Sequence, residues 1–194
     1  MSHAIYQTKA VILSSKNMRE SNKLLVFLTE KFGLIYVTSQ SLRELKSKMR
    51  FHTNKYSLVT IDVVQGRNIW RLTGIHELQS SLSFVDSNWY VLIDKISSLI
   101  MRLCSSEEPY PELWNDVENI FNTIQDNKNT SQKIVSSIEI IYVIRLLHHL
   151  GYWDGTELFL SDDDFTQQQY YDEIQNNKKK YISKINSALV DSQL

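Results

Sequence analysis

The fold class is decided by the stretch YSLVTIDVV, residues 56–64. Its apolar side chains at positions 59, 61 and 63 alternate with Thr60 and Asp62, which is the two-residue period of a strand with one buried face. The turn QGRN follows at 65–68, and residues 69–78 read as the returning strand. This hairpin predicts β-structure with an apolar interior.

Three further strands precede that hairpin. One β-rich run covers Ile5 to Leu13 and is bounded by Ser14-Ser15. Two more, Leu24 to Thr29 and Leu34 to Thr38, are joined by a tight turn at 31–33 and read as a hairpin. Five strands in fewer than 80 residues, joined by short turns and one long loop, predict a small closed barrel.

Helical spacing replaces the strand pattern after Ser80. Helices are predicted over Trp89–Cys104, from Pro109 or Pro111 onward, over Gln132–Leu150, and from about Thr166 to Val190. The third helix is apolar nearly all round, which is typical of a buried central helix, and Gly151 ends it. We therefore predict an α+β chain of two domains, a five-stranded barrel over 1–80 and an all-α domain over 81–194.

Charge divides along the same boundary. Residues 1–79 carry 12 Lys and Arg against 5 Asp and Glu, a net charge of +7, and the remainder carries 9 against 17, a net charge of −8. Four of the basic residues gather in one loop, RELKSKMR at 43–50, and Lys55 follows just after it. A cationic loop between apolar strands is a ready surface for polyanions.

Some functional classes are disfavoured by composition. With one cysteine, Cys104, the chain has no disulfide framework or four-cysteine zinc site of its own, which fits a reducing cytosol. Cys104 lies in an apolar helical pattern and reads as a core thiol. No signal pattern or membrane-length apolar stretch is present. The five glycines are scattered, so no phosphate-cradling loop for ATP hydrolysis is expected.

Three motifs in the first 34 residues resemble the N-terminal domain of the bacterial RecO recombination-mediator family. They are TKAVIL at 8–13, RESNKLL at 19–25 and LTEKFGL at 28–34. The later basic loop and the turn at Gly66-Arg67 also fall where that family has them, and the helix ending in Leu150-Gly151-Tyr152 resembles its helical domain. The resemblance covers most of the chain and is most specific at 8–34.

The resemblance implies an oligonucleotide-binding (OB) barrel that binds single- and double-stranded DNA and anneals strands. It also implies work with RecR and with the acidic C-terminal tail of the single-strand-binding protein SSB, to load RecA in the RecF-type repair pathway. A cytoplasmic, nucleoid-associated protein with no catalytic step and no membrane partner is expected. Many members carry a four-cysteine zinc module after the Leu-Gly-Tyr helix, but residues 151–155 lead here into an acidic segment without cysteine, so we expect no zinc and no cofactor.

Single-strand binders combine cations that follow the phosphates with aromatic faces on which bases stack. The candidate phosphate-binding and loop residues are Lys23, Arg43, Lys46, Lys48, Arg50, Phe51, Lys55, Arg67 and Arg71. Phe51 is the best candidate stacker, because a loop is less able to bury it. Tyr36 and Trp70 are further candidates, but aromatic residues in alternating strands more often belong to the core.

The helical part offers weaker candidates. His148 and His149 are adjacent on a helix and diverge too far to share a metal ion. Asp162-Asp163-Asp164 favour the start of the last helix more than a magnesium site. Lys178, Lys179 and Lys180 read as a solvated face or as a docking site for an acidic peptide.

Two alternatives to DNA binding remain. One is a protein-binding adaptor that does not contact DNA, and the other is an enzyme. No nucleophile–base pair with informative spacing supports the enzyme.

Overall fold

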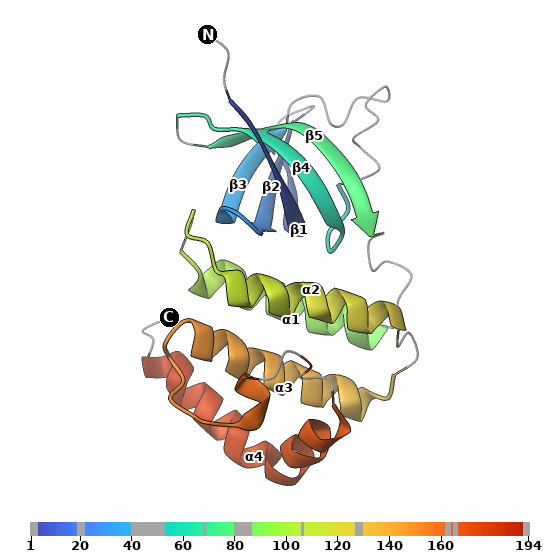
Figure 1. Cartoon of the computed structure of the whole chain (residues 1–194), viewed down its shortest axis with the longest axis vertical. Coiled ribbons are helices and arrows are strands. Elements are labelled where there is room, and N and C mark those ends of the chain that lie inside the picture. Colours follow the sequence, from blue (N-terminus) through green and yellow to red (C-terminus); the bar gives the residue numbers. More distant parts are fainter. Residues whose placement is uncertain are drawn as a thin grey trace. The chain divides into compact units, whose positions relative to one another are not determined.

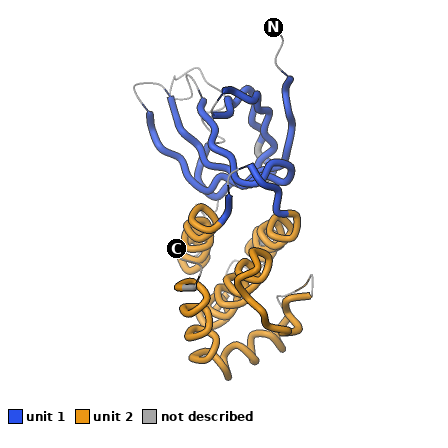
Figure 2. Tube along the Cα trace, turned by 90° about the vertical axis from the view of Figure 1, so that its left-hand side faces the viewer, with its two compact units in different colours: residues 1–84, 104–110 blue, residues 85–103, 111–194 orange. Residues whose placement is uncertain are grey.

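The computed structural model describes residues 4–18, 22–39, 53–67, 69–79, 87–105, 107–126, 130–161, 164 and 167–191. The chain forms two compact units, which Figure 2 colours separately. The barrel unit comprises residues 1–84 and 104–110, and the helical unit comprises 85–103 and 111–194. The predicted class, α+β with a β-barrel followed by helices, is confirmed.

The barrel unit is a closed barrel of five strands (Figure 1). The strands are β1 Ile5–Met18, β2 Asn22–Thr29, β3 Gly33–Ser39, β4 Leu58–Val64 and β5 Trp70–Gln79. Their order around the barrel is β1-β2-β3-β5-β4. The β3–β5 pair is parallel, and the other described pairs are antiparallel. Closure gives each of the five described strands a paired neighbour on both sides.

Strand β1 is longer than its sequence pattern predicts, and its predicted end at Ser14-Ser15 is wrong. The register shifts between Ile12 and Ser14, where a bulge bends the strand. Before the bulge β1 pairs with β4, and around and beyond it β1 pairs with β2 as far as Met18. Two serines that look like a strand terminus therefore lie within the strand.

The barrel core follows the two-residue alternation. Val59, Ile61 and Val63 are fully buried, whereas Thr60 and Asp62 between them remain partly exposed, as predicted. Burial of each such aliphatic side chain contributes about 1.5–3 kcal/mol. The core consists of Ala10, Ile12, Leu25, Phe27, Ile35, Val37, Val59, Ile61, Val63, Trp70, Leu72 and Ile75.

A short segment that follows the first helix belongs to the barrel unit. We call residues 104–110 the strap. The Glu107 amide donates to the Leu34 carbonyl at 2.9 Å, and the Glu108 carbonyl lies over Gly33, where a Cβ would come within 1.7 Å of it. Gly33 also has a φ of +63°, so both its conformation and this close approach require glycine. Cys104 opens the strap and is buried, as expected of a core thiol.

The helical unit is built around its third helix. Its elements are α1 Ser87–Leu103, α2 Pro111–Asp126, α3 Gln132–His149, the 3₁₀ turn η3 Leu158–Leu160 and α4 Gln168–Asp191. Helix α3 contacts α1, α2, η3 and α4 and is buried on nearly all sides, which confirms the prediction of a central helix. Gly151, with a φ of +79°, ends it, and its amide donates to the His148 carbonyl at 2.9 Å.

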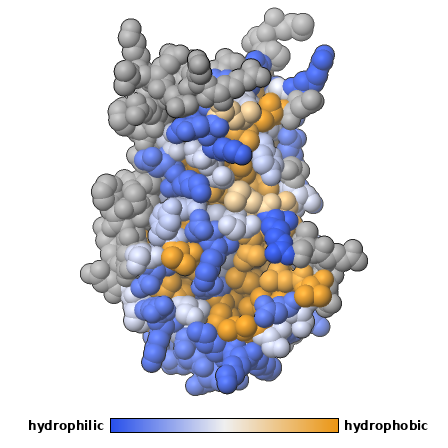
Figure 3. Space-filling model, turned by 180° about the vertical axis from the view of Figure 1, so that it is seen from behind, coloured by the Kyte–Doolittle hydropathy of each residue, from blue (hydrophilic) through white to orange (hydrophobic). Residues whose placement is uncertain are grey.

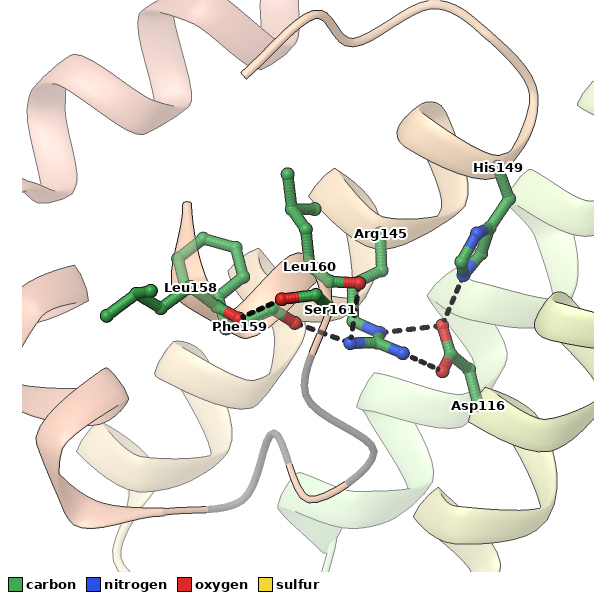
Figure 4. A network of polar contacts seen from close by, with 7 residues as sticks. All are labelled: Asp116, Arg145, His149, Leu158, Phe159, Leu160 and Ser161. Carbon is green, nitrogen blue, oxygen red and sulfur yellow. Dashed lines mark hydrogen bonds and ion pairs between the residues drawn. The ribbon is translucent and has the colours of Figure 1, made fainter. Parts of the chain in front are cut away.

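A buried polar network crosses this unit (Figure 4). Arg145 of α3 donates from Nε and Nη2 to the two oxygens of Asp116 on α2, at 2.8 and 2.6 Å. His149 Nε2 lies 2.8 Å from Asp116 Oδ2, and Arg145 Nη1 donates to the Phe159 carbonyl of η3. Arg145 and Asp116 are 5% and 1% exposed, so this bidentate ion pair is desolvated and joins α2, α3 and η3.

The last helix starts close to the predicted position. Helix α4 begins at Gln168 with no acidic residue in its first turn, and Asp164 lies four residues before it. The effect of the acidic run on this helix start stays a prediction. Asp162 and Asp163 lie outside the described residues. Among the helices that the structure describes, none has both the length and the apolar character needed to cross a membrane.

Candidate nucleic-acid interface

Outward-facing residues on four neighbouring strands form a continuous row across the barrel. Strand register pairs Lys16 with Leu24, Leu24 with Thr38, and Thr38 with Arg71. We call these four residues the outer row. Lys16 and Arg71 are exposed, and the two residues between them are half-buried. Neighbouring strands lie about 4.8 Å apart, so the path from Lys16 to Arg71 along the curved barrel surface is about 14 Å.

Tyr36 lies one step along β3 from the outer row. It is 39% exposed, pairs in register with Val26, and points outward between the inward-facing Ile35 and Val37. Two residues along a strand span about 7 Å, so Tyr36 and Thr38 are neighbours on the same face. The structure thus places the predicted Tyr36 and Arg71 on one surface of the barrel.

Lys23 has a structural contact of its own. Its Nζ donates to Thr53 Oγ1 at 3.2 Å, and its register partner on β3 is Ser39. Ser39 and Thr53 are the last described residue before 40–52 and the first after it. Lys23 therefore contacts described residues on both sides of 40–52, the stretch that contains the predicted cationic loop.

Two further predicted cations are exposed. Lys55 precedes β4, and its Nζ lies 5.8 Å from the Tyr56 ring centroid. Arg67 lies in the turn between β4 and β5, four positions before Arg71. In that turn Gly66 faces the Ile69 carbonyl, which a Cβ would approach to 2.3 Å. Glycine at 66 thus permits the tight turn that presents Arg67.

Trp70 is a core residue, and its suggested stacking role is not compatible with its position. The indole is 4% exposed and packs against Phe32 and Tyr6, with ring centroids at 5.1 and 5.8 Å, and those two rings also contact each other. Its Nε1 donates to Glu107 Oε1 at 2.8 Å. No face of the ring is open to a base, so the alternative that the sequence favoured, a strand aromatic in the core, describes Trp70.

Five candidates lie outside the described residues: Arg43, Lys46, Lys48, Arg50 and Phe51. Sequence reasoning also missed one cation, Lys16. Its place in the outer row depends on the bulge in β1, which carries the strand past Ser14-Ser15. The register across the turn between β1 and β2 could have identified it, because extending β1 to Met18 pairs Lys16 with Leu24.

The candidates of the helical unit have separate roles. Lys178 donates to Ser136 Oγ at 2.8 Å and is half-buried, whereas Lys179 and Lys180 are exposed. His148 contacts the Trp153 carbonyl while His149 contacts Asp116, so the two rings serve different partners. Within the described part of the chain, no three His, Cys, Asp or Glu side chains are grouped to hold a metal ion.

Exposed apolar side chains gather on the helical unit. Figure 3 shows them in orange over the lower half of the molecule. Among the large apolar residues, Leu158 and Val190 are 72% and 74% exposed. Such a surface is typical of protein contacts rather than of phosphate binding.

One comparison with known proteins gives a match. Residues 1–80 match the family model described as recombination protein O N terminal. No curated protein matches the chain. The matched residues cover all five strands of the barrel and include the outer row and Tyr36. The match supports a role in DNA repair and recombination. Residues 1–80, which form most of the barrel unit, thus carry the N-terminal domain of the recombination protein O (RecO) family.

Proposed function

We propose that the protein is a DNA-binding recombination mediator that anneals strands and acts with RecR and SSB to load RecA in the RecF-type pathway. The observation that carries this proposal is an OB-type barrel of the RecO family with exposed cations, Lys16 and Arg71, on one outer face. The proposal includes no catalytic step and places the protein in the cytoplasm, at the nucleoid.

Binding is expected to be electrostatic in large part. Lys16, Arg67 and Arg71 are exposed, and the first 79 residues carry a net charge of +7. Each phosphate neutralised by a cation releases condensed counterions, so log affinity for a single strand falls with log salt by roughly 0.7 per contact. We expect the basic residues Arg43, Lys46, Lys48 and Arg50 to add to this, because they are close in sequence to Ser39 and Thr53, which both contact Lys23.

The test is fluorescence anisotropy of labelled oligo(dT) with the full chain across a salt series. The wild type should bind more weakly as salt rises. Removing four cations, in a variant with Arg43, Lys46, Lys48 and Arg50 changed to Ala, should lower both the affinity and the salt slope. A second variant, Lys16→Ala with Arg71→Ala, should reduce the slope by roughly 1.4 if each cation binds one phosphate.

Lys31→Ala is the matched control for charge. Lys31 belongs to the same unit and is exposed, but it lies in the turn between β2 and β3, away from the outer row, where its Nζ donates to the Gln7 carbonyl. Its removal should leave the salt slope nearly unchanged. Unaltered binding by the two multiple variants would show that the cations have been wrongly assigned. Salt-independent capture of a protein, with no retention on DNA, would favour the adaptor instead.

The proposed contact for the acidic SSB tail is the exposed pair Lys179 and Lys180 on α4. These ammonium groups attract a peptide that carries several carboxylates. Lys178 supports the pair by anchoring α4 to Ser136 of α3. Replacing Lys179 and Lys180 with Ala should weaken binding of a labelled acidic peptide, whereas Lys133→Ala, an exposed lysine of α3, should not. Equal losses in both variants would contradict this placement.

A further inference from the structure

We propose that the outer row together with Tyr36 is a site for an unpaired DNA strand, with Tyr36 as its base-stacking platform, and that this ring gives the barrel a preference for single strands over duplex. The inference rests on the proposed DNA-binding function and adds the class of DNA that this face selects. It concerns residues on β1, β2, β3 and β5, all inside the described part of the barrel unit.

The position of Tyr36 on the barrel surface suits a platform. On one side of Tyr36 lies the outer row, whose residues are exposed or half-buried. On the other side, the outward residues Val11, Leu28 and Leu34 form a row in register that is only 1% exposed at each position. Tyr36 is therefore the aromatic residue at the border between a buried apolar row and an open row that ends in two cations.

The Tyr36 ring is also accessible to a ligand. Among the contacts of the described residues, none uses the Tyr36 hydroxyl, and no described aromatic ring pairs with it. Trp70, in contrast, packs against two aromatic rings and donates its Nε1 within the barrel unit. An exposed ring without an internal partner contributes little to the core, so its exchange is tolerated by the fold.

The two DNA forms offer different groups to this surface. Bases of a single strand have open faces that stack on an aromatic ring, whatever their sequence. In a duplex these faces are occupied by neighbouring bases, and what remains outside is phosphate and sugar. Lys16 and Arg71 therefore bind either form, whereas Tyr36 adds affinity only for the unpaired one.

The experiment compares two labelled probes on the full chain at one salt concentration, oligo(dT) and a hairpin duplex with the same number of phosphates. In Tyr36→Ala, affinity for oligo(dT) should fall by about fivefold or more, the loss of one stacked base. Affinity for the duplex should change by less than about twofold, because its phosphate contacts remain. Tyr36→Phe and Tyr36→Trp should retain oligo(dT) binding, since both keep an aromatic face.

Tyr152→Ala is the matched control, because Tyr152 of the helical unit is 41% exposed, close to the value for Tyr36. It should bind both probes as the wild type does. If Tyr36→Ala binds both probes normally, or loses both equally, the inference is overturned while DNA binding by the wild type stands. If the wild type binds neither probe, the proposed function is overturned, and the inference with it.

Discussion

The two units treat charge in opposite ways. In the barrel unit the core cluster is wholly apolar, and the exposed cations Lys16 and Arg71 lie on the outside. In the helical unit a full ion pair, Arg145 with Asp116, is buried between helices and accompanied by His149. The outward charges are available to bind a polyanion, whereas the buried pair is committed to joining α2, α3 and η3. The position of a charge, exposed or buried, thus distinguishes residues that can bind a partner from residues that stabilise the fold.

The largest expected effect comes from breaking the buried network. Asp116→Ala leaves the Arg145 guanidinium buried without its counter-ion, which should lower the free energy of unfolding by about 3–5 kcal/mol. Denaturant titration followed by tryptophan fluorescence measures this, because Trp89, Trp114 and Trp153 all belong to the helical unit. Lys95→Ala removes an exposed pair with Glu139 and should cost at most about 1 kcal/mol. Equal costs would show that burial does not distinguish the two pairs.

The second effect concerns the strap. Burial, with the nearby Glu108 charge, raises the pKa of the Cys104 thiol from 9.0 to about 12. The native thiol should therefore react with thiol reagents at least about a hundredfold more slowly than an exposed cysteine at neutral pH. Since the folded pKa lies above the unfolded one, the stability that the neutral thiol contributes is complete below pH 9.0 and is lost as pH rises toward about 12. Rapid labelling of the native protein would contradict this.

The next largest effect is expected for the stability of Gly33→Ala. A Cβ here meets the Glu108 carbonyl, and a φ of +63° is unfavourable for alanine, so a loss of about 1–3 kcal/mol is expected. The strap must shift, and Cys104 should label faster than in the wild type. Gly151→Ala is the informative control, because φ is +79° there but nothing lies within 4 Å of the added Cβ. It should destabilise the chain without accelerating the labelling of Cys104.

The smallest effect is expected at Lys184→Met in the helical unit. Lys184 Nζ lies 4.1 Å from the Trp153 ring centroid and 3.1 Å from Asp154 Oδ1. Loss of the cation–π contact should cost about 0.5–1 kcal/mol. The hydrogen bond and charge of Lys184 lower the pKa of Asp154, so that pKa should rise in the variant. An NMR titration of the Asp154 carboxyl measures it, and an unchanged pKa would show that the pair does not persist in solution.

The sequence predicted those features that depend on local periodicity. Alternation at 59, 61 and 63 identified the inward face of β4, and the apolar run at 132–150 identified the central helix. It could not predict contacts between distant residues. Arg145 and Asp116 are 29 positions apart, and neither carries a local signal that the other is its partner.

The candidate site shows the same limit. Arg71 and Tyr36 were found as residue types within strands, but their shared face follows from the parallel β3–β5 pairing, which has no local signature. Lys16 was missed because a bulge carried β1 past two serines. The strand pattern of Trp70 was compatible with either role, and its burial among distant residues, Phe32 and Glu107 among them, assigns it to the core.

The claim that the outer face of the barrel binds DNA is tested most directly by photo-cross-linking. A single strand carrying iodouracil is irradiated with the full chain, and the cross-linked peptides are mapped by mass spectrometry after trypsin digestion. We expect adducts in the peptide 32–43, which contains Tyr36, and their loss in Tyr36→Ala. Adducts confined to residues 87–191, in the helices and their connections, would contradict the assignment of the barrel as the nucleic-acid interface.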